Sequence, residues 1–370
     1  MKICIFGTHS NISSRMQIIK LGFEDLGYKY SEINVPLSME ELDDKAHFKL
    51  YQIAWRIFRR FKLYVLAIVN YRVVINSDWL FLSFPSHLDV PLALLLGKLF
   101  NKKVAFDPCF SLYDTNIYDL NILDKNSIYA ILLYKFEKYI FNGVDIVIAD
   151  TNYQRNYYCQ LFNIPKSKVE VVCLGANDRV YRTLSNQISD TTIVTYYGMY
   201  NPLHGVPYLM KAAKILMNNK TIQFDCIGVG QTYAESVAIA KNLGLTNVRF
   251  LELREKEAVP YLKKSDIFIG FLADSQTAKK QIPNKVFQGL ALGKTILTAR
   301  SPAIESELED NVSVVLVNPS DPIDIANKIL YLSKNKVKSR KIAEKGNKIY
   351  TDRFTPKKIG LQLLKIMSNT

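Results

Sequence analysis

Short runs of β-branched and aromatic residues alternate along the chain with longer segments in which apolar residues recur at helical spacing. This alternation is typical of parallel α/β units. In the first half the runs predict strands at 2–6, 28–34, 79–84, 103–107, 144–149 and 169–173. In the second half they predict strands at 192–198, 222–228, 247–251, 266–271, 294–298 and 313–317. Each set is long enough for one doubly wound sheet, so the sequence predicts an α/β protein with two Rossmann-like domains.

The boundary between the domains is indicated by residues 183–190, which are polar and have neither helical nor strand periodicity. We therefore expect a first domain at 1–180, a linker at 181–190 and a second domain at 191–345. The remaining segment, 346–370, has a basic and helical pattern, and we expect it to cross back to the first domain. The two domains would face each other across a cleft that receives ligands at the carboxyl ends of the strands.

Composition agrees with a globular protein of this size. The 370 residues are 48% hydrophobic and 22% charged. No apolar stretch reaches the ~18 residues that a membrane span requires. The five cysteines are scattered without a C-x-x-C pair, which argues against a disulfide framework or a cysteine metal site and favours a reducing compartment. The first residues, Lys2 to Gly7, read as a strand and not as a signal peptide, so we expect a cytoplasmic protein.

The net charge of +14 is concentrated in the second half. Residues 1–180 carry 21 Lys and Arg against 18 Asp and Glu, whereas residues 181–370 carry 27 against 16. Such an excess attracts an anionic partner, which can be nucleotide phosphates, an acidic membrane surface or nucleic acid. The chain has no helix-turn-helix, zinc-finger or RNA-recognition signature, so we expect no nucleic acid.

Two glycine-containing loops of the second half follow predicted strands and would line one crevice. In the first loop, Gly198 would let a ligand approach the backbone, and Gly205 would open a helix whose free amide groups can meet an anion. The second loop holds Gly228, followed two residues later by another glycine. Both loops are equally compatible with ordinary strand–turn–helix connections, so neither decides a function by itself.

A third loop is more informative because basic residues gather at the start of a predicted helix. Lys279 and Lys280 precede Pro283, which suits a first helical turn, and Lys285 and Gln288 share a face of that helix. The lysines and the helix N-terminus would converge on a diphosphate, and Gln288 would hydrogen-bond sugar hydroxyls. The alternative is a solvated basic face around a buried apolar stripe.

At this point the sequence resembles glycosyltransferase family 4, the retaining enzymes with the GT-B fold of two Rossmann domains. The motifs of the second half that carry the resemblance are Tyr197-Gly198, His204-Gly205, Gly228-x-Gly230, Val248-Arg249-Phe250, Ser265-Asp266-Ile267, Ile282-Pro283-Asn284-Lys285, Gly293-Lys294 and Val317-Asn318-Pro319-Ser320-Asp321-Pro322. Those of the first half are Gly143 to Thr151, Lys168 to Val172 and Gly175 to Asp178. The resemblance covers nearly the whole chain. It implies a nucleotide-sugar donor and a glycan or lipid-linked acceptor, in the synthesis of cell-surface polysaccharide or glycoconjugates.

Five positions depart from the family's pattern. Met199 and His204 stand where the family usually has an arginine and a lysine, and Lys280 and Gln288 stand at the spacing of its paired glutamates. Asp107 stands where many members carry a histidine. A second hypothesis is therefore a non-catalytic relative that binds a nucleotide or a glycan. A third is a sugar-nucleotide epimerase on the same fold.

A transferase of this kind must neutralise the departing nucleoside diphosphate. The chain has no D-x-D carboxylate pair, so we expect neither a metal nor another cofactor, and a donor site built from the lysines, His204 and Asn284. Glu305 or Glu307 would reach the donor ribose. Gly7, after the first strand, would admit the sugar or form a plain strand–helix turn.

The acceptor hydroxyl should lie against the first domain. Asp107 and Asp114 follow its fourth strand and would orient or deprotonate that hydroxyl. His87 follows the preceding strand and competes for this role. The alternative is that the two aspartates are turn or cap residues and that the histidine is packed.

The segment from Phe48 to Tyr71 is aromatic and basic, and five of its residues recur at helical spacing. The residues concerned are Trp55, Phe58, Lys62, Leu66 and Val69. Such a segment can lie in an anionic membrane surface, on the inner face of the membrane, or pack on its own sheet with the arginines in water.

Overall fold

The computed structural model describes residues 1–9, 14–37, 50–119, 121–183 and 190–370, and for residues 50–57 and 203 it describes the backbone. The chain forms two compact units. Unit 1 consists of Met1–Cys173 together with Pro356–Thr370, and unit 2 is Leu174–Thr355. Among the described helices, none is both long enough and apolar enough to cross a bilayer.

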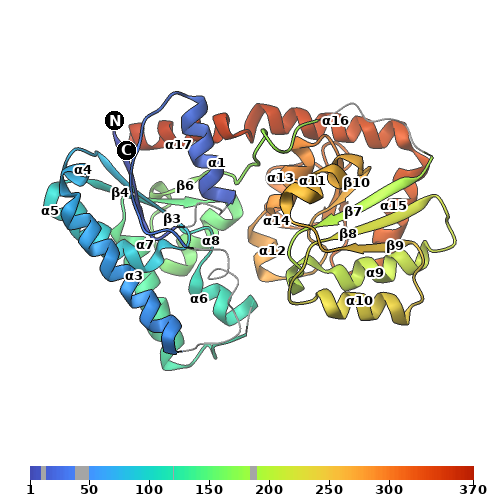
Figure 1. The fold of residues 1–370 in the computed structure, drawn as a ribbon, viewed down its shortest axis with the longest axis horizontal. Coiled ribbons are helices and arrows are strands. Elements are labelled where there is room, and N and C mark those ends of the chain that lie inside the picture. Colours follow the sequence, from blue (N-terminus) through green and yellow to red (C-terminus); the bar gives the residue numbers. More distant parts are fainter. Residues whose placement is uncertain (10–13, 38–49, 120, 184–189) are drawn as a thin grey trace. The chain divides into compact units, whose positions relative to one another are not determined.

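Unit 1 contains a parallel sheet of six strands in the order β2-β1-β3-β4-β5-β6. The strands are β1 (Ile3–Gly7), β2 (Ser31–Asn34), β3 (Trp79–Ser83), β4 (Lys103–Asp107), β5 (Ile146–Ala149) and β6 (Val169–Val171). The helices are α1 (Ser14–Asp25), α3 (Leu50–Val69), α4 (Tyr71–Ile75), α5 (Val90–Phe100), α6 (Leu112–Asp114), α7 (Ile128–Gly143), α8 (Asn152–Phe162) and α17 (Pro356–Asn369), and short turns η1 (Ser86–Asp89), η2 (Thr115–Asp119) and η3 (Lys166–Lys168) connect them. Side chains of α3, α5, α7 and α8 form one core with the strands, and Figure 1 shows α1 and α17 on the opposite face of the sheet.

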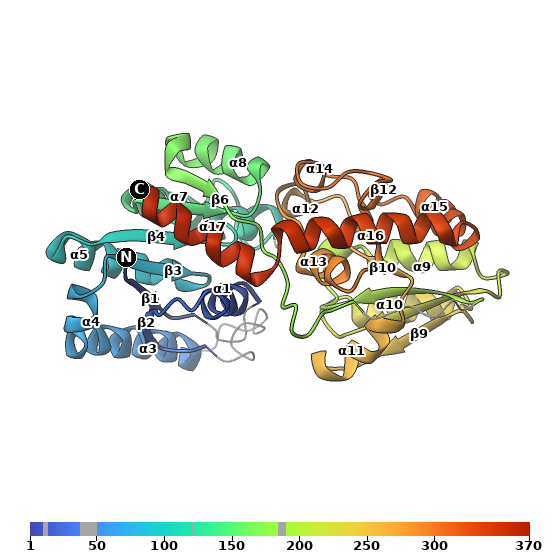
Figure 2. The ribbon, with the colours of Figure 1, turned by 90° about the horizontal axis from the view of Figure 1, so that it is seen from above.

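Helices α1 and α17 come from the two ends of the chain and pack closely in unit 1. The contact depends on two glycines. A Cβ added at Gly22 would lie 2.1 Å from the carbonyl oxygen of Pro356, and one added at Gly360 would lie 3.0 Å from Cα of Gly22. Figure 2 shows α16 (Lys336–Arg353) leading into α17. The prediction that the terminal helix returns to the first domain is confirmed.

Unit 2 contains a second parallel sheet of six strands, in the order β12-β11-β10-β7-β8-β9. The strands are β7 (Thr192–Tyr197), β8 (Ile222–Ile227), β9 (Val248–Leu251), β10 (Ile267–Ile269), β11 (Thr295–Ala299) and β12 (Val315–Val317). The helices are α9 (Val206–Ile215), α10 (Tyr233–Asn242), α11 (Glu255–Lys264), α12 (Gln276–Lys280), α13 (Asn284–Ala291), α14 (Pro302–Glu305), α15 (Pro322–Lys334) and α16, and a short turn η4 (Pro202–His204) precedes α9. Side chains of α9 and α15 form a core with the strands on one face of the sheet, and α13 packs with α16.

The order of the second sheet fixes where a ligand can bind. Strand β7 is the first strand of unit 2 and lies in the middle of the sheet, next to β10. The chain turns to one side after β7 and to the other after β10, so the carboxyl ends of these two strands form a topological switch point.

The fold confirms the prediction of two Rossmann-like domains, and all twelve predicted strands are present with shifts of at most three residues at their ends. The division of the chain differs in detail from the predicted one. It lies after Cys173 and not at residue 180, because Tyr181 is buried in unit 2 and the Tyr350 hydroxyl donates to the carbonyl oxygen of Ala176. It lies again before Pro356 and not at residue 346, because α16 continues to Arg353. Of the predicted linker, residues 184–189 lie outside the described residues.

Candidate functional site

Helix α13 places polar side chains at the switch point of unit 2. It begins directly after Pro283, whose fixed backbone suits the start of a helix, and packs on β10 and β11. Val286, Phe287 and Leu290 are buried as the apolar pattern predicts. Lys285, 5% exposed, is buried with them. The predicted alternative of a solvated basic face is therefore wrong for this helix.

Lys285 has an environment that is unusual for a lysine. Its Nζ lies 3.3 Å from Nδ1 of His204 and 4.0 Å from the centre of the Tyr196 ring. Among the described residues no carboxylate forms an ion pair with it. Burial holds the pKa of Lys285 well below its ordinary value, because removing the ammonium group from water disfavours its charge. An anion bound against Nζ would restore that charge.

Because Gly198 has no side chain, only the backbone of this loop lies next to the Lys285 amine. A Cβ added at Gly198 would lie 3.3 Å from Nζ of Lys285, and the backbone has φ of +131°, which side chains rarely adopt. Tyr196, Gly198, His204 and Lys285 thus form one group, here called the Lys285 cluster. It brings together residues from β7, from the loop that follows it and from α13.

The hydrogen positions in the Lys285 cluster follow from its geometry. The Tyr196 hydroxyl lies 2.7 Å from the carbonyl oxygen of Met199 and 2.7 Å from Nδ1 of His204. A carbonyl can only accept, so the phenol donates to Met199 and His204 Nδ1 carries a hydrogen that it donates to the phenol oxygen. Phe271 stacks on the His204 ring at 5.1 Å and fixes the plane of the imidazole.

Gly205 and Gly228 have explanations in packing. A Cβ at Gly228 would lie 2.2 Å from the carbonyl oxygen of Gly198, and one at Gly205 would lie 2.6 Å from the backbone nitrogen of Ala273. Both glycines also have positive φ. They hold the loops after β7, β8 and β10 together, and a part of either glycine in ligand binding stays a prediction.

Three further predicted donor residues lie at or beside the start of α13. Lys280 and Gln288 are buried and Asn284 is half-buried, and the buried Oδ1 atom of Asn284 has no hydrogen-bond partner in the described part of the chain. Burial lowers the pKa of Lys280 to about 8. A buried amide oxygen without a hydrogen-bond partner destabilises the fold, so a ligand or a water molecule that donates to Asn284 Oδ1 would be stabilising.

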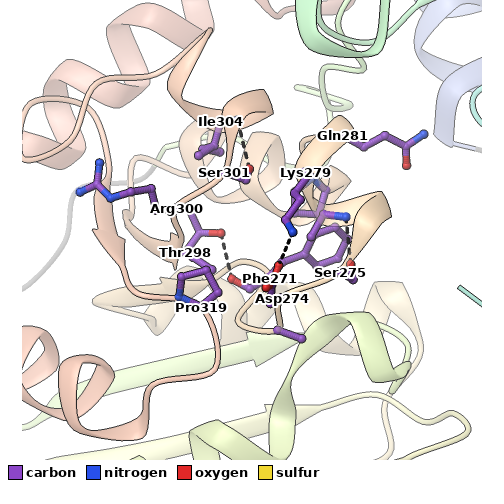
Figure 3. A pocket seen from close by; sticks show the side chains of 14 residues that line it. Phe271, Asp274, Ser275, Lys279, Gln281, Thr298, Arg300, Ser301, Ile304 and Pro319 are labelled. Atoms are coloured by element: carbon purple, nitrogen blue, oxygen red, sulfur yellow. Dashed lines mark hydrogen bonds and ion pairs between the residues drawn. The ribbon is translucent and has the colours of Figure 1, made fainter. Parts of the chain in front are cut away.

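Lys279 points elsewhere. Its Nζ lies 3.0 Å from Oδ1 of Asp274, and both residues line a pocket with an empty volume of about 310 Å³, open to solvent (Figure 3). The remaining lining residues come from the loops after β10, β11 and β12 and include Phe271, Thr298, Arg300 and Pro319. No other predicted donor residue lines this pocket.

Glu305 and Glu307 already have partners in unit 2. Arg300 donates to Oε1 of Glu305 at 2.5 Å, and the guanidinium of Arg353 forms an ion pair with the Glu307 carboxylate. A role of either glutamate toward the donor ribose stays a prediction. To bind the ribose, each glutamate would have to give up its ion pair with arginine.

In unit 1, Asp107 ends β4 and is completely buried. Arg15, on α1, donates from Nε to Oδ2 of Asp107 at 2.6 Å and from its two terminal nitrogens to the carbonyl oxygens of Val172 and Cys173. Asp150, after β5, lies 3.9 Å from the same guanidinium, and burial raises its pKa to about 7 although Arg15 opposes the rise. The sequence reasoning missed Arg15, whose signal was a charged residue on the apolar face of α1.

Asp114 and His87 flank the loop that follows β4. Asp114 accepts from the Tyr157 hydroxyl at 2.5 Å, and Nε2 of His87 lies 3.1 Å from the carbonyl oxygen of Phe110. Because that oxygen is an acceptor, Nε2 carries a hydrogen. Burial lowers the pKa of His87 to about 4, so the ring is neutral near pH 7 and the residue holds the loop in place.

Gly7 is explained without a ligand. It has φ of +119°, and a Cβ at this position would lie 2.6 Å from Oγ of Ser86. The neighbouring Thr8 donates from both its amide and its hydroxyl to Oδ2 of Asp89, at 2.7 and 2.5 Å. This contact with the turn after β3 accounts for the glycine, and a role of Gly7 toward the sugar stays a prediction.

No group of three or more His, Cys, Asp or Glu side chains in the described ranges is arranged to hold a metal ion. The features that unit 2 offers a ligand are the buried amine of Lys285, the neighbouring polar atoms of α13 and the switch point of a parallel sheet. Together they suit a phosphorylated ligand.

Comparison with known proteins bears on the same region. Residues 191–335 match the family model for glycosyl transferases group 1. Unit 2 is a group 1 glycosyl transferase domain. The predicted resemblance to glycosyltransferases is thereby confirmed for this segment, which contains the complete Lys285 cluster. No curated protein sequence matches the chain.

Solved structures similar to the chain include two that cover it from end to end. Anabaena HepE in complex with UDP-glucose has a TM-score of 0.69 and 14% identity, with 100% of both chains covered. Sucrose-phosphate synthase from Thermosynechococcus elongatus has a TM-score of 0.72 and 14% identity, with 100% of this chain and 98% of that chain covered. A variant of S. aureus TarM in complex with fondaparinux, α-GlcNAc-glycerol and UDP has a TM-score of 0.59 and 15% identity, with 80% and 58% covered. These similarities establish the GT-B fold.

Proposed function

We propose that this glycosyl transferase moves a sugar from a nucleoside-diphosphate donor to a glycan or lipid-linked acceptor, and that Lys285 binds the diphosphate. The observation that carries the proposal is the buried amine of Lys285, which has no carboxylate partner among the described residues and lies beneath Gly198 at the switch point. A buried amine of this kind destabilises the empty protein and gains its counter-charge when an anion binds. Charge develops on the diphosphate as the sugar bond breaks, so the same contact would stabilise the transition state.

We further propose that the reaction needs no metal. The cation that a metal would supply is available from Lys285, and Lys280 and the His204 imidazole lie on adjoining elements. Each charge-assisted contact to a phosphate oxygen is worth about 1.5–3 kcal/mol. We assign retention of configuration and a place in cell-surface glycan synthesis by analogy with the family that the sequence resembles.

The nucleotide is proposed to be UDP. HepE was solved with UDP-glucose, and the TarM variant with UDP and α-GlcNAc-glycerol. The acceptor would meet unit 1 at Asp107, whose Oδ1 atom is buried and has no hydrogen-bond partner within the described ranges. That atom would accept a hydrogen bond from the acceptor hydroxyl.

The test is a panel of UDP, GDP, ADP, CMP and dTDP, each with its sugars, measured by thermal shift. A ligand at about 100 times its dissociation constant stabilises the protein by about 2.7 kcal/mol. UDP should raise the melting temperature of the wild type and leave that of Lys285→Ala unchanged. Lys338→Ala is the matched control, because Lys338 is an exposed lysine on α16 of the same unit, 5.2 Å from the Tyr331 ring.

Equal responses of the two lysine variants would refute the assignment of the diphosphate to Lys285. A wild type that binds none of the nucleotides would favour the non-catalytic relative. Release of UDP together with formation of an epimerised sugar in the absence of any acceptor would favour the epimerase.

We also propose that unit 1 rests on an anionic membrane surface through α3, α4 and α5. The exposed side of α3 carries apolar residues at helical spacing, including Phe61, 62% exposed, and Ile68, 72% exposed. Helix α4 contacts both α3 and α5, and α5 adds Leu95 and Leu99, both exposed. Lys62 is exposed within the same stripe of α3. The side chain of Trp55, part of the predicted membrane segment, lies outside the described residues.

Co-sedimentation with vesicles tests this surface. Wild-type protein should bind vesicles that contain phosphatidylglycerol and not vesicles of phosphatidylcholine alone. The double variant Phe61→Ser, Ile68→Ser should lose the binding. Leu361→Ser, at an exposed apolar position of α17, is the control, and equal loss in both proteins would contradict the proposed surface.

A further inference from the structure

A short loop joins the two aspartates that sequence reasoning placed at the acceptor site. It runs from Asp107 at the end of β4 to Asp114 in α6. Its backbone is held by Glu137, a residue of α7 that the sequence reasoning did not consider. Glu137 is completely buried, although carboxylates rarely are.

The three hydrogen bonds that Glu137 accepts all come from this loop. Its Oε2 accepts from the Ser111 hydroxyl at 2.5 Å and from the Tyr113 amide at 2.9 Å, and its Oε1 accepts from the Leu112 amide at 2.8 Å. The Ser111 oxygen in turn accepts from the amide of Asp114 at 3.1 Å. One carboxylate therefore satisfies the free amide groups at the start of α6 and fixes the residue next to Asp114.

We propose that Glu137 is a positioning residue of the acceptor site, which orders the loop between Asp107 and Asp114 so that both carboxylates are held for the acceptor. The proposal rests on the proposed function, in which unit 1 receives the acceptor. Glu137 is buried behind the loop and would not touch the acceptor itself. Its effect would pass through the backbone of residues 111–113.

The protonation state of Glu137 should control this order. The titratable groups that face it are His87 from η1, with Nε2 at 3.7 Å from Oε1, and Tyr158 from α8, whose pKa Glu137 helps to raise. Burial lowers the pKa of His87 to about 4 and raises that of Tyr158 well above its usual value, so both are uncharged near pH 7. Burial raises the pKa of Glu137 to about 7, although its three hydrogen bonds oppose the rise. The three hydrogen bonds favour the ionised form of Glu137, so opening of the loop while Glu137 stays buried raises its pKa further, and the loop is held better above pH 7 than below it. Global unfolding exposes Glu137 to water and therefore has the opposite pH dependence.

The experiment measures amide hydrogen exchange of Leu112, Tyr113 and Asp114 at about pH 6 and pH 8, corrected for intrinsic exchange, in wild type, Glu137→Gln and Ser111→Ala. Loss of a hydrogen bond to a charged group corresponds to a change of about tenfold. In the wild type, protection of these amides should fall about tenfold from pH 8 to pH 6. In Glu137→Gln, protection should be low at both pH values. Glu24→Gln, an exposed glutamate of α1 in the same unit, should behave as the wild type.

A second experiment measures the rate of the reaction. UDP release from UDP-glucose, with n-octyl β-D-glucoside as the probe acceptor, should fall about tenfold in Glu137→Gln and lose its dependence on pH near 7, while UDP affinity stays within twofold of the wild type. Ser111→Ala should give part of the loss at a melting temperature close to that of the wild type, which excludes general unfolding as the cause.

The proposal is overturned if Glu137→Gln keeps wild-type protection of the loop amides, or if protection in the wild type is the same at both pH values. Loss of UDP affinity in Glu137→Gln would also overturn it, because the effect would then not be confined to unit 1. A wild type that binds no nucleotide refutes the proposed function instead, and the exchange data then decide the role of Glu137 in the loop independently of catalysis.

Discussion

Replacing Lys285 with methionine should make the empty protein more stable. Methionine keeps most of the volume of the lysine stem, so the packing among Val286, Leu290 and their neighbours is preserved. What is removed is an amine that is 5% exposed and lies 3.3 Å from His204 Nδ1, an atom that donates its own hydrogen to Tyr196 and so does not accept one from the amine.

The magnitude follows from the cost of burying a polar group. A buried polar group with incomplete hydrogen bonding costs about 1–3 kcal/mol. The contact with the Tyr196 ring, at 4.0 Å, would offset this by about 1 kcal/mol if the amine were charged, but burial disfavours that charge. We therefore expect the free energy of unfolding of unit 2 to rise by about 1–2 kcal/mol, which for a unit of this size raises the melting temperature by about 2–8 °C.

The assay compares melting temperatures with and without saturating UDP. Without UDP, Lys285→Met should melt above the wild type. With UDP at about 100 times its dissociation constant, the wild type gains about 2.7 kcal/mol and the variant gains nothing, so the order reverses. Lys294→Met is the matched control: Lys294 is also buried, but its Nζ donates to the carbonyl oxygen of Lys263 at 2.6 Å, so its replacement should destabilise.

The reasoning would be refuted if Lys285→Met melted more than about 3 °C below the wild type in the absence of nucleotide. Such a result would mean that the amine is satisfied in the empty protein and holds the loops of β7 and α13 together. Its burial would then be a feature of the fold and not of a donor site.

Three further predictions concern unit 1. Gly22→Ala should cost about 1–3 kcal/mol in urea denaturation, because the new Cβ would lie 2.1 Å from the carbonyl oxygen of Pro356, and wild-type stability would contradict the contact. Arg15→Leu should cost about 3–5 kcal/mol, since it leaves the buried carboxylate of Asp107 without its partner, and a loss below about 1 kcal/mol would contradict a stabilising role of this ion pair. Glu137 has a pKa of about 7 in the fold against about 4.5 in the unfolded chain, so its contribution to the free energy of unfolding is complete below pH 4.5 and is lost as the pH rises to 7 and above. Glu137→Gln should flatten that part of the stability profile, and equal slopes in the two proteins would show that another group causes the decline.

The positions of the strands could be predicted because they depend on the local sequence. Buried parallel strands require short apolar runs, and each run from Ile3 to Val317 formed a strand within a few residues of its expected place. The end of the first domain could not be predicted in this way. Residues 174–183 have no periodicity, and their place in unit 2 depends on long-range contacts such as the 2.6 Å hydrogen bond from the Tyr181 hydroxyl to Glu255.

The part of the candidate site that could be predicted is the one where polar residues recur at helical spacing. Lys285 lies on a face that the sequence spacing identified, whereas its burial depends on the surrounding loops. Glu137 and Arg15 left a weaker signal, a charged residue on an otherwise buried helical face, next to Ile140 and Phe141 in α7 and to Ile18 in α1. The partners of such residues are distant in sequence, so spacing cannot distinguish a positioning role from a chance position on the surface.

The membership of α17 in unit 1 has a consequence for the order in which the chain folds during synthesis. Unit 2 is finished when Thr355 has left the ribosome, whereas the sheet of unit 1 still lacks the helix that covers α1. Domains usually complete themselves from the N-terminus onward. Here the sheet of unit 1 is translated before unit 2 but is covered after it, and α1 keeps an exposed apolar side, including the glycine contact at Gly22, until α17 emerges.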